Sequence, residues 1–392
     1  MRIGIVVAEF PSYSETFFIN KVIGLCERGH EVIVFRVNRH QNEVLEDLYS
    51  FKKYPNLQIV SFDFNATALS RISAIIRHPW VCIKNAHINM AAYKKNIYYN
   101  LCLIHFKKYR CDVFHFGYSG LAVYYYSLFN SLERKIMVSC LGTAEKVKAL
   151  ADPVRKDKLK LVFNRANSIH CVSADMAEAI KYYGAAESKT YINRPAIDTD
   201  FFSRKNEYKK SGHLQILSIG RFVFQKGFVL GLMAVYELSK QFENFTWKIA
   251  GEGADMEEMI FHINNLKLND KVELLGKKTK YEIRELYEQS DIFFLPSVCE
   301  GIANVVLEAM SMELPVVSSD AGGMGEAISN GANGLLFANY DQLSMTAALL
   351  QLCNDFELRK TLGAAARKTA VEHFSLKRYI DVFEAEYQRL ID

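Results

Sequence analysis

The sequence predicts two α/β domains, each built around a doubly wound parallel sheet. The chain has 392 residues, half of them hydrophobic, which is too long for one ordinary core and suits two domains. In both halves, short apolar runs alternate with segments of helical periodicity, as expected when helices cover both faces of a parallel sheet. A charged stretch at 203–213 separates the halves and is interpreted as a linker.

The first forty residues follow a strand–helix–strand pattern. The unbroken apolar run at 3–8 predicts a buried strand, and 32–37 predicts the next one. Between them, Ser14 is placed to cap a helix, and Gly29 is placed to end it in the left-handed conformation. Parallel strands joined in this way form a right-handed crossover. Further strands are predicted at 57–61, 112–116, 135–140 and 168–172.

The alternation restarts after residue 213 and continues almost to the end of the chain. Strands are predicted at 214–220, 245–251, 272–275, 292–296 and 315–318. The last segment, 373–392, is predicted to be an amphipathic helix. Its apolar face comprises Leu376, Tyr379, Ile380, Phe383, Tyr387 and Leu390.

Composition argues against several classes of protein. Charged residues make up 23% of the chain and net charge is only +4, which fits neither a disordered chain nor a nucleic-acid binder. No two of the eight cysteines are closer than nine positions, so no Cys-x-x-Cys pair is present, and a reducing cytoplasmic setting is expected. The N-terminal apolar stretch is too short for a signal peptide, and no run reaches the length of a membrane span.

Common nucleotide and metal motifs are also missing. The loop after the first predicted strand, 9–16, contains no glycine and therefore no dinucleotide fingerprint. The sequence has neither a P-loop nor a His-Glu-x-x-His zinc motif. These absences weaken dehydrogenase, ATPase and metalloprotease interpretations.

The segment 297–310 carries the most informative pattern. A buried strand ends at Pro296, a turn with Glu300 and Gly301 follows, and then a helix begins. Ligands of open α/β sheets bind beyond the carboxyl ends of strands, where a helix N-terminus attracts phosphate. Glu300 and Glu308 would lie ~12 Å apart along a helix, so they suit the two ends of one extended ligand. On spacing alone, an alternative is equally open, in which Glu300 is only a carboxylate at the entry of a helix and Glu308 is a surface residue.

A second element, 220–227, also follows a predicted buried strand. Arg221 and Lys226 stand five positions apart beside glycines, where a planar guanidinium and an ammonium suit a diphosphate. Alone, such a pair is usually exposed to water. Its joint occurrence with 297–310, in one domain, makes a phosphate site the stronger hypothesis.

The second half resembles the family 4 retaining glycosyltransferases, which have the GT-B fold. The matching motifs occur in family order over about 120 residues, and the Glu-x7-Glu pair is the family hallmark. The matching residues are Gly220-Arg221, Lys226-Gly227, 250–253, 295–297, Glu300-Gly301, 308–310, 315–317, Gly322-Gly323 with Glu326, and Gly331 followed by Gly334.

The first half resembles the same family more loosely. Its motifs at 10–17, 29–32 and 115–117 look like the branch that builds bacterial exopolysaccharides of the colanic-acid type. The segment 191–201, with Arg194 and Asp198, is similar to the usual interdomain passage. The resemblance implies two Rossmann-like domains facing a central cleft. They are an acceptor domain at 1–195, completed by a terminal helix at 374–392 that crosses back to it, and a donor domain at 196–373.

The resemblance also implies roles for individual residues. Arg221 and Lys226 would bind the donor diphosphate, Glu300 would contact the transferred sugar as the catalytic residue, and Glu308 would bind the ribose. The acceptor side would include Ser14, Glu15, Thr16 and Gly142. Neither a cofactor nor a metal is expected, because the sequence shows no acidic cluster to bind one. The backbone that would hold the β-phosphate comprises Gly301, Ile302, Ala303 and Asn304.

One position departs from the family pattern. Many relatives have a His-Gly pair after the fifth strand, whereas this chain has Leu141 followed by Gly142. The change removes a polar group near the reacting sugar. Either the acceptor or another residue, with His115 as the catalytic candidate, compensates for it, or the activity is weak. A lone histidine at a strand end is more often structural.

A basic segment at 71–110 suggests a surface for anionic membranes. No Asp or Glu occurs from residue 64 to 111, and basic residues alternate with aromatic ones. The alternative is a solvated helix whose aromatics fill the core. A lipid-linked acceptor would explain membrane contact at the inner face of the plasma membrane. The basic residues are Arg71, Arg77, Lys84, Lys94, Lys95, Lys107, Lys108 and Arg110.

Together these observations predict a glycosyltransferase of the retaining, hexosyltransferase type, which moves a sugar from a nucleoside diphosphate sugar to a glycan or lipid-linked glycan. Two alternatives stay open. One is a sugar-nucleotide epimerase or phosphorylase on the same fold. The other, suggested by Leu141, is an inactive partner subunit that binds a nucleotide sugar.

Overall fold

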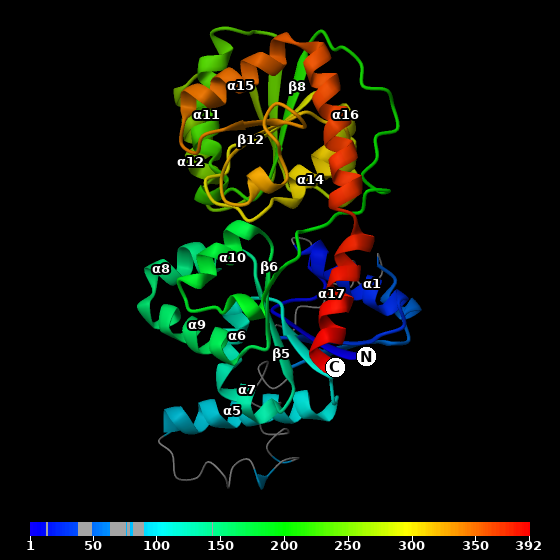
Figure 1. The fold of residues 1–392 in the computed structure, drawn as a ribbon. Coiled ribbons are helices and arrows are strands. Elements are labelled where there is room, and N and C mark those ends of the chain that lie inside the picture. The colour runs from blue at the N-terminus through cyan, green and yellow to red at the C-terminus, as the bar shows by residue number, and fades with distance from the viewer. Residues whose placement is uncertain (13–14, 38–48, 63–75, 77–78, 81–89, 143) are drawn as a thin grey trace. The chain divides into compact units, whose positions relative to one another are not determined.

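The computed structural model describes residues 1–12, 15–37, 49–62, 76, 79–80, 90–142 and 144–392 (Figure 1). The chain divides into two compact units. The first comprises Met1–Cys171, Ala177–Asn193 and Ile380–Asp392, and the second comprises Val172–Met176 and Arg194–Tyr379.

The first unit is built on a parallel sheet of seven strands in the order β3-β2-β1-β4-β5-β6-β7. The central strand pairs Ile5 with Val34 on one side and with His115 on the other. The order reverses beside the first strand, as in a doubly wound sheet. The strands are β1 Arg2–Val7, β2 Glu31–Arg36, β3 Leu57–Ser61, β4 Val113–Phe116, β5 Lys135–Cys140, β6 Ser168–Cys171 and β7 Thr190–Ile192.

Helices cover both faces of this sheet. Phe106 on one helix packs against Phe114 and Phe116 of β4, and the opposite face of β4 carries His115, which meets Lys21 and Tyr387 from two other helices. The helices are α1 Thr16–Glu27, α5 Met90–Lys108, α6 Ser119–Tyr125, α7 Phe129–Leu132, α8 Ala149–Ala151, α9 Pro153–Arg165 and α10 Ala174–Lys181.

The second unit contains a parallel sheet of six strands in the order β10-β9-β8-β11-β12-β13. Its strands are β8 Leu214–Ile219, β9 Phe245–Ala250, β10 Val272–Gly276, β11 Ile292–Leu295, β12 Val316–Ser319 and β13 Leu335–Phe337. Its helices are α11 Phe228–Ser239, α12 Met256–Asn265, α13 Lys280–Gln289, α14 Asn304–Ser311, α15 Gln342–Asn354 and α16 Phe356–His373.

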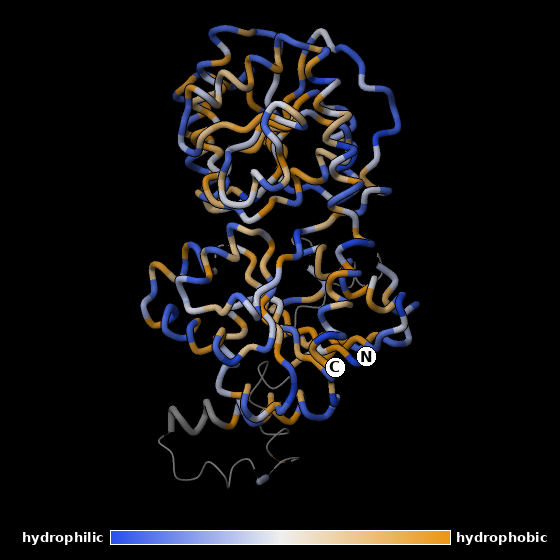
Figure 2. Tube along the Cα trace, in the orientation of Figure 1, coloured by the Kyte–Doolittle hydropathy of each residue, from blue (hydrophilic) through white to orange (hydrophobic). Residues whose placement is uncertain are grey.

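The core of the second unit lies on both faces of its sheet. Leu232, Met259 and Leu349 bring α11, α12 and α15 into one buried cluster. Tyr287 and Val306 bring α13 and α14 into the other. In Figure 2 orange, apolar segments accordingly gather in the interior of the unit. The predicted pair of doubly wound α/β domains is confirmed.

The charged stretch 203–213 is not a linker, which corrects the sequence interpretation. The Arg204 guanidinium donates to the carbonyl oxygens of Met312 (2.9 Å) and Glu288 (3.0 Å). Tyr208 is buried and its hydroxyl donates to the Asp291 carbonyl at 2.6 Å. Two anchoring side chains therefore hold a segment without helix or strand onto the second unit, and the chain passes between the units at Asn193 and Arg194.

The terminal helix α17, Leu376–Ile391, belongs to the first unit from Ile380 onward, while its first residues up to Tyr379 belong to the second unit. Its apolar face packs inward: Phe383 and Tyr387 are fully buried. Ile380 lies so close to α1 that a Cβ on Gly24 would approach its Cγ1 to 2.7 Å. The amphipathic pattern of 373–392 is thus explained by docking onto helix and strand.

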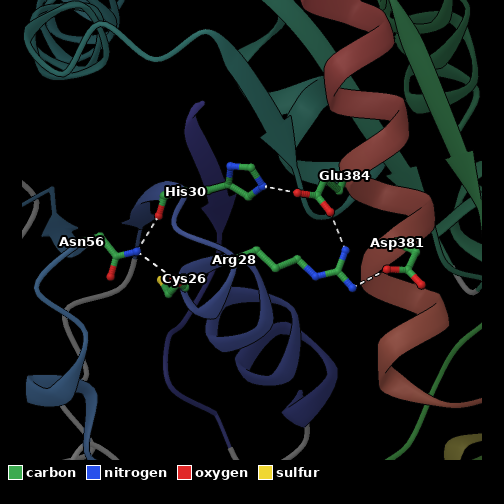
Figure 3. A network of polar contacts seen from close by, with 6 residues as sticks. All are labelled: Cys26, Arg28, His30, Asn56, Asp381 and Glu384. Atoms are coloured by element: carbon green, nitrogen blue, oxygen red, sulfur yellow. Dashed lines mark hydrogen bonds and ion pairs between the residues drawn. The ribbon is translucent and has the colours of Figure 1, made fainter.

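Ion pairs fix the outer side of α17 (Figure 3). Arg28, at the end of α1, forms ion pairs with Asp381 and Glu384, and His30 Nε2 lies 2.7 Å from Glu384 Oε1. The loop carrying Arg28 and His30 is itself tied down, because the Asn56 amide donates to the His30 carbonyl at 2.8 Å. Gly29 adopts a φ of 81°, which confirms the predicted left-handed end of α1.

Candidate functional site

The turn after β11 brings two of the predicted donor residues together. Lys226 Nζ lies 2.6 Å from Glu300 Oε1, and both side chains are largely shielded from solvent. The Ser297 hydroxyl donates to the same Glu300 oxygen at 2.9 Å. The structure therefore joins an ammonium from the loop after β8 to a carboxylate from the loop after β11, at the carboxyl ends of adjacent strands.

A glycine makes this approach possible. Gly227 follows the turn Phe224–Lys226, has a φ of 63°, and lies where a Cβ would come within 2.0 Å of the Pro296 carbonyl oxygen. Only glycine permits that contact without strain. Arg221 stands at the start of the same loop with its side chain exposed, and within the described chain it forms no ion pair.

The loop after β12 packs directly on the Glu300 turn. Gly322 has a φ of 67°, and a Cβ there would lie 2.0 Å from the Glu300 carbonyl oxygen. The Gly323 amide donates to the Gly301 carbonyl at 2.8 Å. The Gly-Gly motif noted in the sequence thus supports the backbone that presents Glu300.

Helix α14 begins at Asn304, directly after this turn. In the part of the chain that the structure describes, the amides of Gly301, Ile302, Ala303 and Asn304 donate to no backbone oxygen. Free amides at the positive end of a helix dipole suit an anion, and phosphate in particular. The four predicted β-phosphate ligands are therefore placed beside Glu300 and Lys226.

Glu308 lies one turn further along α14 and meets a side chain that the sequence analysis missed. Tyr287, fully buried on α13, places its hydroxyl 3.0 Å from Glu308 Oε2 and 2.9 Å from the Val305 carbonyl oxygen. Burial raises the pKa of Glu308 to about 7, against the opposing effects of the Tyr287 hydrogen bond and the Lys280 charge. No local motif signals Tyr287, because its contact with α14 is tertiary.

Lys280 begins α13 and lies over an aromatic ring. Its Nζ is 3.9 Å from the centroid of Phe201, and the Arg284 guanidinium is 4.8 Å from the same ring. Burial lowers the pKa of Lys280, while Asp198 and Glu308 raise it. Two cations thus surround the Phe201 ring beside Glu308.

Glu326 links two separate segments of the second unit. Its Oε2 accepts from Arg194 at 2.7 Å, and its Oε1 accepts from the Ala174 amide at 2.7 Å. Both partners belong to the second unit, in the segments 172–176 and 194–379. Two residues noted from the family pattern, Arg194 and Glu326, therefore anchor these segments to each other.

His115, predicted as a catalytic candidate, is instead part of the core of the first unit. It is fully buried, with Nε2 2.7 Å from the Ser139 hydroxyl and Nδ1 2.6 Å from the Tyr387 hydroxyl. Burial, with the nearby Lys21 and His170, lowers its pKa well below the usual range. A ring with no exposed surface touches no substrate, so the structure argues against the catalytic prediction and indicates a role in docking α17.

The remaining acceptor-side predictions lie at strand and helix ends of the first unit. Glu15 and Thr16 are half-buried at the start of α1, whereas Ser14, which was also predicted to cap that helix, lies outside the described residues. Gly142 follows β5 with a φ of 139°, and its amide donates to Glu145 Oε2 at 3.2 Å. Glu145 is fully buried and its pKa is raised by that burial, a feature the sequence analysis missed.

An apolar pocket of about 260 Å³ opens beside the Gly227 loop, but it does not suit a diphosphate. Its charged lining residues are Asp255 and Glu258, which would repel phosphate. Elsewhere in the described chain, no three His, Cys, Asp or Glu residues group as metal ligands. No described helix has the length and apolar character needed to cross a bilayer.

Two family models match the chain, one in each half. The model of glycosyltransferase family 4 matches residues 14–201, and that of glycosyl transferases group 1 matches residues 200–369. An amylovoran biosynthesis glycosyltransferase of Erwinia amylovora is 26% identical over 408 aligned residues, which cover 98% of this chain and 99% of that protein. A putative colanic acid biosynthesis glycosyltransferase of Escherichia coli is 25% identical, with 95% and 96% covered.

Solved structures share the fold over the whole chain. Anabaena HepE in complex with UDP matches with a TM-score of 0.77 at 15% identity, covering all of both chains. A sucrose-phosphate synthase from Thermosynechococcus elongatus matches with a TM-score of 0.78 at 15% identity, covering 100% of this chain and 99% of that one. These structures share the GT-B fold, and with family models that together span residues 14–369 the chain belongs to the family 4 glycosyltransferases.

Proposed function

We propose that the chain is a retaining glycosyltransferase that uses a nucleoside diphosphate sugar as donor. The observation that carries this proposal is the Lys226–Glu300 pair beside the unpaired amides at the start of α14. A cation, a carboxylate and free amides at adjacent strand ends suit the two parts of such a donor, its diphosphate and its sugar. The domain roles follow from this placement: the donor binds mostly to 196–373, and the acceptor binds to 1–195.

Each group at the site has a physical reason for its proposed role. Negative charge develops on the diphosphate as the sugar leaves, so Arg221, Lys226 and the amides of 301–304 stabilise the transition state. Glu300 accepts hydrogen bonds from sugar hydroxyls and faces the positive charge that develops on the ring. Glu308 accepts hydrogen bonds from the ribose. Because these groups neutralise the leaving diphosphate, donor binding needs no divalent metal.

The proposed reaction takes place on one face of the sugar. The bond from the anomeric carbon to the diphosphate oxygen breaks, and the acceptor oxygen forms its bond on the same face. The acceptor proton passes to the leaving diphosphate, so no strong protein base is required. This suits a chain that has Leu141 where many relatives have histidine, and in which His115 is buried.

The acceptor is proposed to be a glycan or a lipid-linked glycan of a bacterial cell-surface polysaccharide. The support is the full-length similarity to proteins named for amylovoran and colanic acid biosynthesis. Transfer of a hexosyl unit in the cytoplasm follows as part of the same proposal.

A thermal-shift screen against UDP, GDP, ADP and their sugars tests the donor class. We expect one nucleotide series to raise the melting temperature, because a ligand that binds only the folded state stabilises it. The shift is expected to be unchanged in EDTA. No shift with any series would contradict the proposed function. A shift with no sugar transfer to any glycan acceptor would instead favour an inactive partner subunit, the alternative that Leu141 suggests.

Contact with an anionic membrane through 71–110 is a separate proposal. Much of that segment, including Arg71, Arg77 and Lys84, lies outside the described residues. In the described part, Phe106 fills the core, whereas Lys107 is exposed and lies 4.0 Å from Glu133.

We expect the protein to sediment with phosphatidylserine vesicles at low ionic strength and to dissociate as salt increases, because salt screens exposed charges. Neutral phosphatidylcholine vesicles are the control. Equal recovery with both vesicle types, or none with either, would show that the basic segment has another role.

A further inference from the structure

We propose that Tyr287 positions the Glu308 carboxyl for the donor ribose, and that donor binding expels a proton from this pair. The inference rests on the proposed function, because it assigns the ribose to Glu308. It adds a positioning residue from α13 and a linkage between donor affinity and pH.

The Tyr287 hydroxyl has one proton to donate and lies within hydrogen-bonding distance of two acceptors, the Val305 carbonyl and Glu308 Oε2. A carbonyl oxygen only accepts. If the hydroxyl donates to Val305, the contact with Glu308 needs a protonated carboxyl that donates to the tyrosine oxygen. If the hydroxyl donates to Glu308, the carboxyl can be ionised, and the charge strengthens that hydrogen bond.

The surroundings bring these two states close in free energy. The carboxyl of half-buried Glu308 lies beside the fully buried Tyr287, and removal of the carboxyl from water disfavours its charge. Lys280 at the start of α13 acts in the opposite direction, since its charge favours an ionised Glu308. Asp198 and Arg284 act on Lys280 with opposite signs. The pKa of Glu308 is accordingly raised to about 7, within the range where a bound ligand can change its charge.

A bound ribose would favour the state in which Glu308 is ionised. Its two vicinal hydroxyls donate best to the two oxygens of an ionised carboxylate, because hydrogen bonds to a charged acceptor are about twice as strong as neutral ones. Tyr287 then turns its proton to Glu308 and holds the carboxylate in place. Val305 lies in the first turn of α14, where its carbonyl can accept from the backbone amide four residues further on, so it does not depend on Tyr287 for a hydrogen bond. Donor binding therefore selects the ionised state, and the carboxyl proton leaves to solvent.

A ligand that binds only the ionised carboxyl binds more tightly as pH rises through the pKa of that group and reaches a plateau above it. For a pKa of about 7, binding releases roughly half a proton at pH 7 and is roughly fivefold weaker at pH 6 than at pH 7.

Isothermal titration calorimetry of the full-length protein measures both quantities. UDP-glucose, GDP-glucose and ADP-glucose are the probes, because their diphosphates carry no group that titrates near neutral pH. Titrations from pH 6 to pH 8, in buffers of different ionisation enthalpy, give the number of protons released. Binding with no proton release at pH 7 would overturn the inference, while leaving the proposed function intact. Failure of all three sugars to bind would refute the proposed function and this inference with it.

Two variants separate the positioning role from a merely structural one. Glu308→Gln removes the titrating group, so proton release should vanish and affinity should fall. Tyr287→Phe removes the donor to the ionised carboxyl, so affinity should fall several-fold and the midpoint of the pH dependence should move upward. The matched control is Tyr208→Phe, which removes another buried tyrosine hydroxyl that donates to a carbonyl in the same unit. A midpoint unchanged in Tyr287→Phe, or shifted equally in Tyr208→Phe, would contradict the assignment of Tyr287.

Discussion

Glu300→Gln is expected to lower turnover by on the order of 100-fold while the fold and most of the nucleotide affinity are retained. The glutamine keeps the shape of the side chain and its hydrogen-bonding oxygen, so the contact with Ser297 can persist. It removes the negative charge that would face the developing positive charge on the sugar ring. Loss of that charge affects the transition state more than the bound donor, so kcat should fall and the nucleotide dissociation constant should change little.

The measurement is the initial rate of sugar transfer, paired with nucleotide binding by calorimetry and unfolding by circular dichroism. Glu285→Gln, on the exposed side of α13, is the control for the substitution itself. A Glu300→Gln variant as fast as the wild type would remove Glu300 from the mechanism. NMR of the wild-type product must also show the anomeric configuration of the donor, since an inverted product would contradict one-face transfer.

The sequence was sufficient for the architecture because buried parallel strands leave a strong local signal. Apolar runs such as 214–220 and 292–296 place strands within a residue or two of their observed ends. Thr190–Ile192 and Leu335–Phe337 were missed, since three residues at a sheet edge make no recognisable run. The stretch 203–213 was wrongly predicted to be a linker because charged residues dominate its composition. Hydrogen bonds of two side chains, Arg204 and Tyr208, instead hold it onto the second unit.

The candidate site shows the same limit. Lys226, Glu300 and the glycine pair at 322–323 were found from local motifs, and the structure brings them together. Tyr287 and the burial of His115 depend on contacts between distant parts of the chain. The His115 ring contacts the hydroxyl of Tyr387, which lies 272 positions further along the chain. No local sequence pattern around His115 predicts that α17 covers it. Tertiary burial therefore decides which polar side chains reach a substrate.

Arg221→Ala and Lys226→Ala are each expected to weaken binding of the nucleoside diphosphate by about 1.5–3 kcal/mol, because each removes a charge-assisted contact. The structure predicts that the two losses differ. Arg221 is exposed and forms no ion pair within the described chain, so its removal leaves no carboxylate without a counter-ion. Removing Lys226 leaves Glu300 without its counter-ion in a shielded position next to the phosphate site. Lys226→Ala should therefore have the larger effect, since an unpaired carboxylate repels the incoming diphosphate.

A double variant tests this explanation. In Lys226→Ala combined with Glu300→Gln the repelling charge is gone, so nucleotide affinity should recover part of what Lys226→Ala loses, although turnover stays low. The coupling between the two positions is read from the binding free energies of the single and double variants. Lys240→Ala, which removes an exposed ammonium paired with Glu237 on α11, is the control for loss of a positive charge. Additive losses in the double variant would show that the ion pair has no part in donor binding, and unchanged affinity in both single variants would show that the two cations are ordinary surface residues.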